Sequence, residues 1–284
     1  MRSIWHLNVN TEGSSLAELL IKLSGFSKKK IQWIATSGGL WSKKQGSVKR
    51  CRRLPKGVSK GDEFFLYYDE HILQQTPLAA ECMADHKAWS AWFKPQGMPT
   101  VGSKWADHTA ITRFIETHKD FQRTCFLVHR LDKQTSGVML LAHDKKTAKL
   151  LSQLFEQRQI DKYYLAKIDR QHLDFFYKIP RFINHQVINK EAKTAVLAKF
   201  IYADYLGLLI KLFTGRKHQI RSHLSSENCP LIGDRAYGDS LDRRNLGLMA
   251  YRIVFICPIS LNLIDLTIPQ QKKIDFVLAE NKAG

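Results

Sequence analysis

The sequence lacks any long uninterrupted run of apolar residues. Its best runs, 137–142 and 206–210, fall far short of the roughly 18 residues that a membrane-spanning helix requires. Residues 1–15 include Asn8, Asn10 and Glu12, where a secretory signal would have its apolar stretch. We therefore expect no membrane span, no export and a cytoplasmic location.

Cysteine is also scarce and scattered. The cysteines have neither the paired spacing of a zinc site nor the even count of a disulfide framework, and they are Cys51, Cys82, Cys125, Cys229 and Cys257. Two histidines, His218 and His223, lie five residues apart, but the two-His-plus-Glu spacing of a zinc hydrolase is missing. We expect reduced thiols and no bound metal.

Acidic residues are few compared with basic ones. The 284 residues contain 26 Asp and Glu against 44 Lys and Arg, a formal charge of +18, while 44% hydrophobic residues suffice for a folded core. Eleven of the positive charges lie in 28–60, a window without an acidic residue. Cations crowded in this way repel one another unless phosphates are present, which favours RNA as the partner over the alternative of a merely solvated basic face. The candidate RNA-binding residues are Lys28, Lys29, Lys30, Lys49, Arg50, Arg52 and Arg53.

The distribution of charge and apolar patterns predicts two domains. We expect a small basic domain over 1–70, a linker over 71–88 that contains Pro77, and a larger domain over 89–284. Helical patterns occupy 14–26, 28–33, 107–118, 144–159 and 217–226, and strand patterns occupy 40–42, 64–68, 89–93, 126–128, 137–142, 163–168, 196–200 and 206–212. Because hairpin signals outnumber strand-helix-strand units, the fold class is α+β, with a mixed, mainly antiparallel sheet flanked by helices.

Several motifs of the larger domain occur together in one order. The loop HRLDKQTSG, 129–137, packs charged groups between two apolar strands and resembles the HRLD-x-x-TSG motif of the RluA-type pseudouridine synthases. The other similar segments match the family's KP-x-G at 94–97, K-x-Y-x-A at 162–166 and GR-x-HQIR-x-H at 215–223. The segment PLIGD with YG, at 230–238, resembles the family's P-I-x-GD-x-x-YG turn. The resemblance covers residues 93 to about 256. The chain departs from the family pattern at Met249, where a histidine is usual, and at Asn228, where glycine is common.

The resemblance implies an isomerase that converts an RNA uridine to pseudouridine without cofactor. Its catalytic residue would be Asp132, acting as a nucleophile or as a base, two routes that the sequence leaves open. Arg221 would lie beside this carboxylate and favour its ionised form. Tyr164 would stack on the uracil in preference to Tyr163, since successive strand residues face opposite ways.

Other roles also follow from the resemblance. Arg130 would help to flip the uridine out of its stack and take its place, while Leu231 and Ile232 would line the base pocket. The histidines His129, His218 and His223 are expected to be mainly structural or to face phosphate. The basic domain loosely resembles the S4-type RNA-binding domain.

Two functions remain in competition. The first is a monomeric catalytic synthase acting on rRNA or tRNA, and the second is a non-catalytic RNA-binding or ribosome-associated protein of the same fold. Retention of Asp132, Tyr164 and Arg221 together favours the enzyme, because RNA binding alone does not need them.

Overall fold

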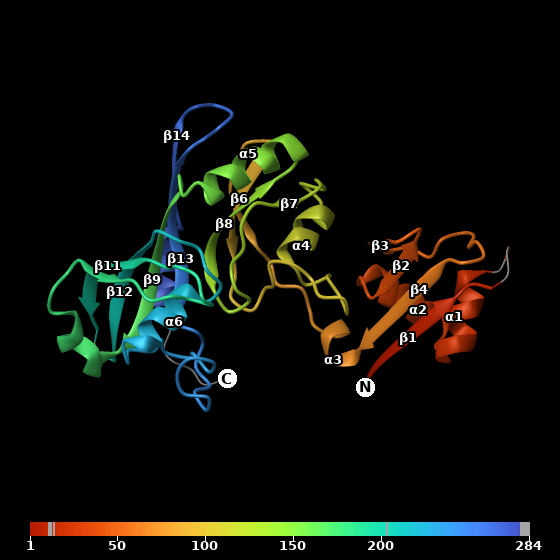
Figure 1. The fold of residues 1–284 in the computed structure, drawn as a ribbon, viewed down its shortest axis with the longest axis horizontal. Helices are drawn as coiled ribbons and strands as arrows, with labels where there is room; N and C mark the ends of the chain where they lie inside the picture. Colours follow the sequence, from red (N-terminus) through yellow and green to blue (C-terminus); the bar gives the residue numbers. More distant parts are fainter. Residues whose placement is uncertain (11–12, 14, 203, 279–284) are drawn as a thin grey trace. The chain divides into compact units, whose positions relative to one another are not determined.

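The computed structural model describes residues 1–10, 13, 15–202 and 204–278. The chain forms two compact units, each described separately below (Figure 1). Unit 1 contains 1–78 and 99–122, and unit 2 contains 79–98 and the chain from 123 onward. No helix in these described ranges is long and apolar enough to cross a membrane.

Unit 1 is built on a sheet with the strand order β1-β4-β2-β3. Its elements are β1 (Arg2–Asn8), α1 (Leu16–Ser24), α2 (Lys28–Thr36), β2 (Leu40–Lys44), β3 (Ser47–Arg50), β4 (Glu63–Asp69), α3 (Glu70–Leu73) and α4 (Ile111–Thr117). Strand β4 alternates buried and half-buried side chains. Its fully buried Phe64 and Leu66 join Leu20 of α1 and Ile34 of α2 in one apolar core. The apolar face of the sheet, with its alternating side chains, therefore packs against the apolar faces of the two helices in this core.

Unit 2 is built on a ten-stranded sheet with the order β10-β11-β12-β9-β13-β8-β6-β5, to which β14 and β7 add at β13 and β8. The strands are β5 (Glu81–Asp85), β6 (Trp89–Lys94), β7 (Phe126–Leu127), β8 (Ser136–Ala142), β9 (Asp161–Asp169), β10 (Arg181–Ile183), β11 (Thr194–Ile201), β12 (Tyr205–Leu212), β13 (Leu248–Ile256) and β14 (Leu263–Thr267). The helices are α5 (Lys145–Glu156), the short 3₁₀ helix η1 (Arg170–Phe176), α6 (Gln219–Ser226) and α7 (Gln270–Leu278).

Two apolar clusters hold this sheet and its helices together. One contains residues of β6, β8 and β13 with Leu151 of α5. The other contains residues of β9 and β12 with Ile220 and Leu224 of α6. Strands β13 and β8 run parallel, whereas the neighbouring pairs β13–β9 and β6–β8 are antiparallel. The predicted α+β class with a mixed, mainly antiparallel sheet is confirmed.

Several elements differ from the sequence prediction. The range expected to be a linker, 71–88, contains the end of α3 and strand β5, which pairs with β6. Residues 99–122 group with unit 1, so that unit is discontinuous in sequence and does not end at 70. The helix expected from 107 begins only at Ile111, and Asp107 before it forms ion pairs with Arg50 and Arg52. Residue 14 of the first expected helix lies outside the described ranges.

Candidate functional site

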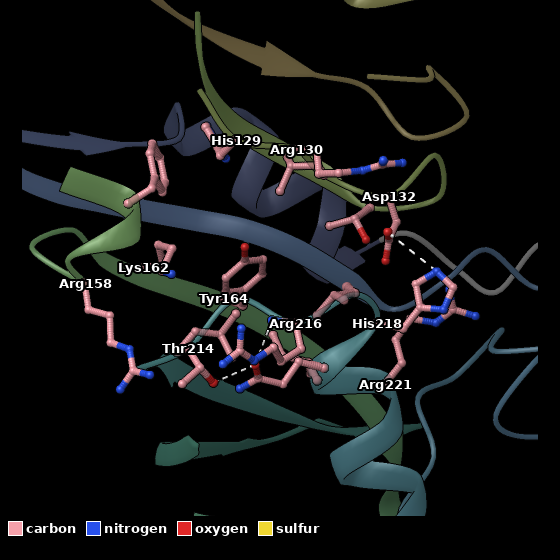
Figure 2. A pocket seen from close by; sticks show the side chains of 18 of the residues that line it. His129, Arg130, Asp132, Arg158, Lys162, Tyr164, Thr214, Arg216, His218 and Arg221 are labelled. Atoms are coloured by element: carbon pink, nitrogen blue, oxygen red, sulfur yellow. Dashed lines mark hydrogen bonds and ion pairs between the residues drawn. The ribbon is translucent and has the colours of Figure 1, made fainter. Parts of the chain in front are cut away.

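Unit 2 contains a cavity of about 500 Å³ over the middle of its sheet (Figure 2). Its walls come from the loop before β8, from β9, β12 and β13, from the last turn of α5 and from the start of α6. Three of the sequence motifs contribute to the walls: the 129–137 loop, the 162–166 strand and the 215–223 segment. The fold therefore brings together residues that are almost a hundred positions apart in the chain.

Asp132 lies in this cavity on the loop between β7 and β8. The backbone N–H of Thr135 donates to the carbonyl oxygen of Asp132 at 3.1 Å and closes the turn, while the preceding Leu131 is buried. The Asp132 side chain is 22% exposed, and its Oδ1 lies 3.6 Å from Nε2 of His218. The carboxylate is thus accessible from the cavity and has a basic group beside it.

His218 is the residue next to Asp132 that the sequence interpretation underrated. It precedes α6 in the left-handed conformation (φ +56°), and its Nδ1 lies 3.1 Å from the hydroxyl of Tyr237. Burial lowers the pKa of His218, and the negative charge of Asp132 opposes that shift. The motif contained the signal, because His218 starts the helix that carries Arg221, but sequence spacing alone did not show the proximity to Asp132.

Arg221, which we expected beside Asp132, forms its ion pair with Asp234. Its Nε and Nη2 donate to the two carboxylate oxygens of Asp234 at 2.8 and 2.7 Å. Asp234 is fully enclosed and also accepts the backbone N–H groups of Ala236 and Tyr237. The hydrogen bonds from Arg221 to Asp234 raise the pKa of Arg221, and the negative charge of Asp132 makes a smaller contribution. Arg221 lines the cavity, but its partner is Asp234 and not Asp132.

Tyr164 faces the cavity from the middle of β9, where Ile210 of β12 and Ala250 of β13 flank it. Its neighbour Tyr163 is absent from the cavity walls and lies near the cations of Lys211 and Arg252. Strand alternation therefore places Tyr164 on the expected side. Burial and the charge of Asp132 raise the pKa of Tyr164, so its hydroxyl stays protonated and can donate a hydrogen bond at neutral pH.

Lys94 supports the loop that carries Asp132. At the end of β6 its side chain is completely buried, and its Nζ donates to the carbonyl oxygens of Met98 at 2.8 Å and Lys133 at 3.4 Å. The backbone N–H of Gly97 also donates to the Lys133 carbonyl, at 2.9 Å. Burial lowers the pKa of Lys94 to about 7, and Asp132 opposes the shift. The KP-x-G and HRLD motifs are thus joined by hydrogen bonds.

The other predicted site residues divide between the cavity and the core. Arg130 is exposed and borders the cavity (Figure 2). Leu231 and Ile232 are buried and do not appear among the cavity walls, whose apolar part includes Leu131 and Leu248 instead. Leu231 and Ile232 therefore do not line the cavity as we expected, and Leu131 and Leu248 do so instead.

The remaining two histidines have hydrogen-bond partners within the fold. His129 accepts the backbone N–H of Leu140 on Nε2 at 2.8 Å, and burial lowers its pKa to about 3. His223 is enclosed in α6 and donates from Nε2 to the carbonyl of His185 at 2.9 Å. Both arrangements agree with the structural role expected for them.

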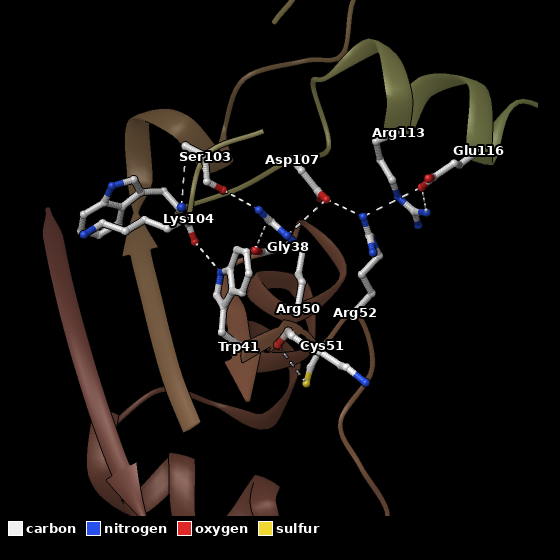
Figure 3. Close-up of polar contacts among 12 residues, drawn as sticks. Gly38, Trp41, Arg50, Cys51, Arg52, Ser103, Lys104, Asp107, Arg113 and Glu116 are labelled. Atoms are coloured by element: carbon white, nitrogen blue, oxygen red, sulfur yellow. Dashed lines mark hydrogen bonds and ion pairs between the residues drawn. The ribbon is translucent and has the colours of Figure 1, made fainter. Parts of the chain in front are cut away.

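The basic residues of unit 1 separate into two groups. Arg50 donates to the carbonyls of Gly38 and Ser103, and both Arg50 and Arg52 form ion pairs with Asp107 (Figure 3). These two arginines are therefore engaged in contacts inside unit 1, which the charge window did not predict. The charge window missed this because Asp107 lies outside it. Exposed candidates remain at Lys28, Lys29, Lys49 and Arg53.

No group of three or more His, Cys, Asp or Glu side chains that could hold a metal ion occurs in the described part of the chain. The walls around Asp132 carry the cationic guanidinium groups of Arg221 and Arg130 and the imidazole of His218. Such surroundings suit an anionic substrate better than a metal cation.

The family model described as RNA pseudouridylate synthase matches residues 89–226. The chain is 29% identical over 231 residues to ribosomal large subunit pseudouridine synthase D of Borreliella burgdorferi, covering 71% of this chain and 70% of that protein. It is 31% identical to tRNA pseudouridine synthase C of Pasteurella multocida over 202 residues, which covers 59% of this chain and 82% of that protein.

Solved structures agree on the fold. Human RNA pseudouridylate synthase domain containing 4 superposes with a TM-score of 0.54 at 21% identity, covering 70% of this chain and 92% of that one. Human RNA pseudouridylate synthase domain containing 1 superposes with a TM-score of 0.55 at 20% identity, covering 69% of this chain and 86% of that one. With these matches and the motifs gathered in one cavity, the chain belongs to the RNA pseudouridylate synthase family and is an RluA-type isomerase that converts uridine in RNA to pseudouridine.

Proposed function

We propose that Asp132 is the catalytic carboxylate of this isomerisation. The reaction breaks the bond between N1 of uracil and C1′ of ribose, turns the base, joins C5 to C1′ and releases the proton from C5. A single carboxylate can serve either as the nucleophile or as the base in a route through a glycal. The observation that carries the proposal is that Asp132 faces the cavity, where its Oδ1 lies 3.6 Å from Nε2 of His218.

Tyr164 and Arg221 assist Asp132 in this proposal. The Tyr164 ring is proposed to stack on the uracil, supported by its position in the cavity wall, and its protonated hydroxyl can donate a hydrogen bond to the base. Arg221 is locked in orientation by its two bonds to Asp234 and contributes positive charge to the cavity without blocking Asp132. Leu131 and Leu248 form the apolar walls against the base.

Arg130 is proposed to take the place of the uridine when it leaves its stack. Extrusion of a base costs a few kcal/mol, and a planar guanidinium can recover part of this cost by stacking and hydrogen bonding. The exposure of Arg130 at the rim of the cavity supports this role, because the side chain can reach an RNA duplex without a change in the core.

The substrate is proposed to be one defined uridine in rRNA or tRNA, since relatives of both kinds match the chain. Unit 1 is proposed to act as a divergent S4-like RNA-binding domain, supported by its two helices on a small sheet and its exposed lysines. The enzyme would work as a monomer in the cytoplasm, without cofactor or metal.

The test is chemical mapping of pseudouridine in rRNA and tRNA from cells that carry either the wild-type protein or Asp132→Asn. The isosteric amide keeps the shape of the loop but cannot attack or accept a proton, so turnover should fall by roughly 10³-fold or more. One defined pseudouridine should disappear and so identify the substrate. Unchanged modification at every site would contradict catalysis by Asp132.

A further inference from the structure

The cavity extends beyond the residues that the isomerisation requires. Asp132 and His218 lie at one end, Tyr164 lies between, and Lys162 and Arg158 lie at the other end (Figure 2). The reaction uses the first end and the middle. The second end is basic, and nothing in the proposed chemistry accounts for it.

Lys162 is the central residue of this basic end. It lies two positions before Tyr164 on β9 and therefore faces the same side of the sheet. Its pKa is lowered by burial and further by the positive charge of Arg158, while Asp161 opposes these effects. Its ammonium group forms no hydrogen bond or ion pair with any residue that the structure describes. A Cβ on Gly215 would lie 3.6 Å from Nζ, so the amine reaches the turn that precedes α6.

Two guanidinium groups line the cavity near Lys162, that of Arg158 at the same end and that of Arg216 nearer to Tyr164 (Figure 2). Arg158 is exposed on the turn between α5 and β9, where its backbone is left-handed with φ +59°. Arg216 is half-buried, and its Nε donates to the carbonyl oxygen of Glu191 at 3.0 Å. The carboxylate of Glu156 lies in the same part of the walls, but it is exposed and forms no ion pair with the three cations in the described structure. Positive charge is therefore in excess at this end.

Such an arrangement is unfavourable for an empty protein. A partly buried ammonium loses hydration, and the neighbouring guanidinium repels it, so the cluster gains free energy when an anion binds. A uracil carbonyl is neutral and needs one donor, whereas an RNA phosphate carries a full charge and several acceptor oxygens. A flipped uridine brings its flanking phosphates to the cavity.

We propose that Lys162, Arg158 and Arg216 form a phosphate subsite, which binds a backbone phosphate of the RNA beside the uridine held at Asp132. This inference rests on the proposed function of the cavity. The subsite fixes the register of the strand, so that C1′ of the flipped nucleotide meets the carboxylate. It adds affinity that depends on backbone charge and not on the identity of the base.

The first test compares Lys162→Met with Lys167→Met. Lys167 is a matched control because it lies on the same strand, is also buried with a lowered pKa, and lines a different cavity near Tyr205. Binding is measured in the Asp132→Asn background, with in vitro transcripts of tRNA and of rRNA, at several salt concentrations. Lys162→Met should weaken binding about tenfold and reduce the log-log salt slope by roughly 0.7 to 0.9, the value for one lost phosphate contact.

Because this binding does not depend on turnover, it tests the subsite even if Asp132 proves not to be catalytic. Whether Asp132 is catalytic is decided separately, by the mapping of pseudouridine in cells that carry the wild-type protein or Asp132→Asn. Equal affinity and equal salt slope for the Lys162 and Lys167 variants would overturn the phosphate subsite. A loss of affinity with an unchanged salt slope would also overturn it, in favour of a contact to the uracil carbonyl.

The second test removes the charge from the RNA. A synthetic hairpin that contains the converted uridine receives one neutral methylphosphonate linkage at a time on either side of it. At one linkage, wild-type binding should fall about tenfold while Lys162→Met binding does not change further, because the contact is already gone. Additive losses at every linkage would overturn the proposal.

The third measurement is the stability of the variant. Removal of a half-buried ammonium without a partner should leave Lys162→Met at least as resistant to urea as the wild type. Weaker RNA binding with retained stability identifies a binding role. A parallel loss of stability would show that Lys162 is structural and would overturn the assignment.

Discussion

At the scale of single residues, the site keeps the carboxylate of Asp132, the proposed catalytic group, apart from the guanidinium group of Arg221. Arg221 forms two short hydrogen bonds with the enclosed Asp234, whereas Asp132 has His218 at 3.6 Å, beyond a normal hydrogen bond. A carboxylate held by both arms of a guanidinium has its lone pairs occupied and is a weaker nucleophile and base. Asp132 is therefore left able to react, while Arg221 still supplies positive charge.

Sequence patterns could identify Asp132 and the face of Tyr164, because a motif and strand alternation depend on local order alone. They could not identify the partner of Arg221, since Asp234 is thirteen residues away in a turn whose path depends on the whole fold. The same limit applies to Lys162, because only the folded cavity shows that its ammonium group has no ion-pair partner among the described residues. Leu231 and Ile232 were misplaced for this reason as well.

Lys94 predicts a pH dependence of stability. Burial lowers the pKa of its amine to about 7 in the folded chain, against roughly 10.4 when unfolded. Between these values the unfolded chain binds more protons, so the contribution of Lys94 to stability rises as pH increases from about 7 towards 10. Below pH 7 both states are protonated, and the cost of the buried charge is fully present.

The measurement is hydrogen exchange of the β6 amides, which reports on unit 2 alone, in the wild type and in Lys94→Met from pH 6 to 9. The free energy difference between the two proteins should shift in favour of the wild type as pH rises. Lys167→Met provides the comparison, since its amine has a folded pKa of about 8 and should show the same trend starting one pH unit higher. A difference that does not change with pH would exclude the lowered pKa of Lys94.

At the scale of elements, the parallel pairing of β8 and β13 joins the two apolar clusters of unit 2. Ser136 and Gly137 of β8 pair with Met249 and Ala250 of β13 directly after the loop of Asp132. Gly137 has φ +117°, and a Cβ there would lie 2.1 Å from the carbonyl oxygen of Ala250. The glycine of the TSG motif is thus required by this close approach, which the sequence showed as a motif without showing the reason.

Gly137→Ala should therefore destabilise unit 2 by at least about 2 kcal/mol, through backbone strain and the clash with β13. Hydrogen exchange of the β8 amides measures this decrease in the free energy of unfolding of unit 2. Gly215→Ala is the control, because its Cβ would meet only Lys162 Nζ at 3.6 Å, and the free energy of unfolding should change by no more than about 0.5 kcal/mol. Equal effects of the two substitutions would contradict the steric explanation.

The predicted strand ranges omitted the long strands β1 and β13 as well as the short strands β3, β5, β10 and β14. β3, β5 and β10 have few residues and no clear alternation, and they are fixed by pairing with β2, β6 and β11. Strand β8, in contrast, is buried along its whole length and was visible as a continuous apolar run. Where the local sequence pattern does not predict a strand, pairing with a neighbouring strand in the folded sheet determines that the segment is one.

At the scale of the whole molecule, the charge of +18 is less concentrated than a sequence window suggests. Asp107 lies outside the window 28–60 and pairs with two of its arginines, and Glu63 pairs with Lys43. Residues 99–122 belong to unit 1, so removal of residues 1–70 would leave Asp107 without its arginines and expose Ala106 of the core. Point substitutions are consequently a better test of RNA binding than truncation.

Lys28 and Lys29 provide such a test. Both are exposed in the first turn of α2, where the helix dipole disfavours cations. We expect a bound phosphate to offset the unfavourable interaction of these two lysines with the helix dipole. Replacing both with Gln should leave unit 1 at least as stable, weaken binding to a tRNA transcript and reduce the log-log salt slope by roughly 1.4 to 1.8, for two lost contacts.

Arg52→Gln is the contrasting variant, since Arg52 pairs with Asp107 at 2.6 Å and is not available to phosphate. It removes one positive charge but breaks an ion pair with a carboxylate that is only 8% exposed, so unit 1 should lose stability while the salt slope hardly changes. The two variants therefore separate net charge from charge that is free to bind. If both reduced the salt slope in proportion to the charge removed, RNA binding would follow total charge, and the face formed by Lys28 and Lys29 would have no special role.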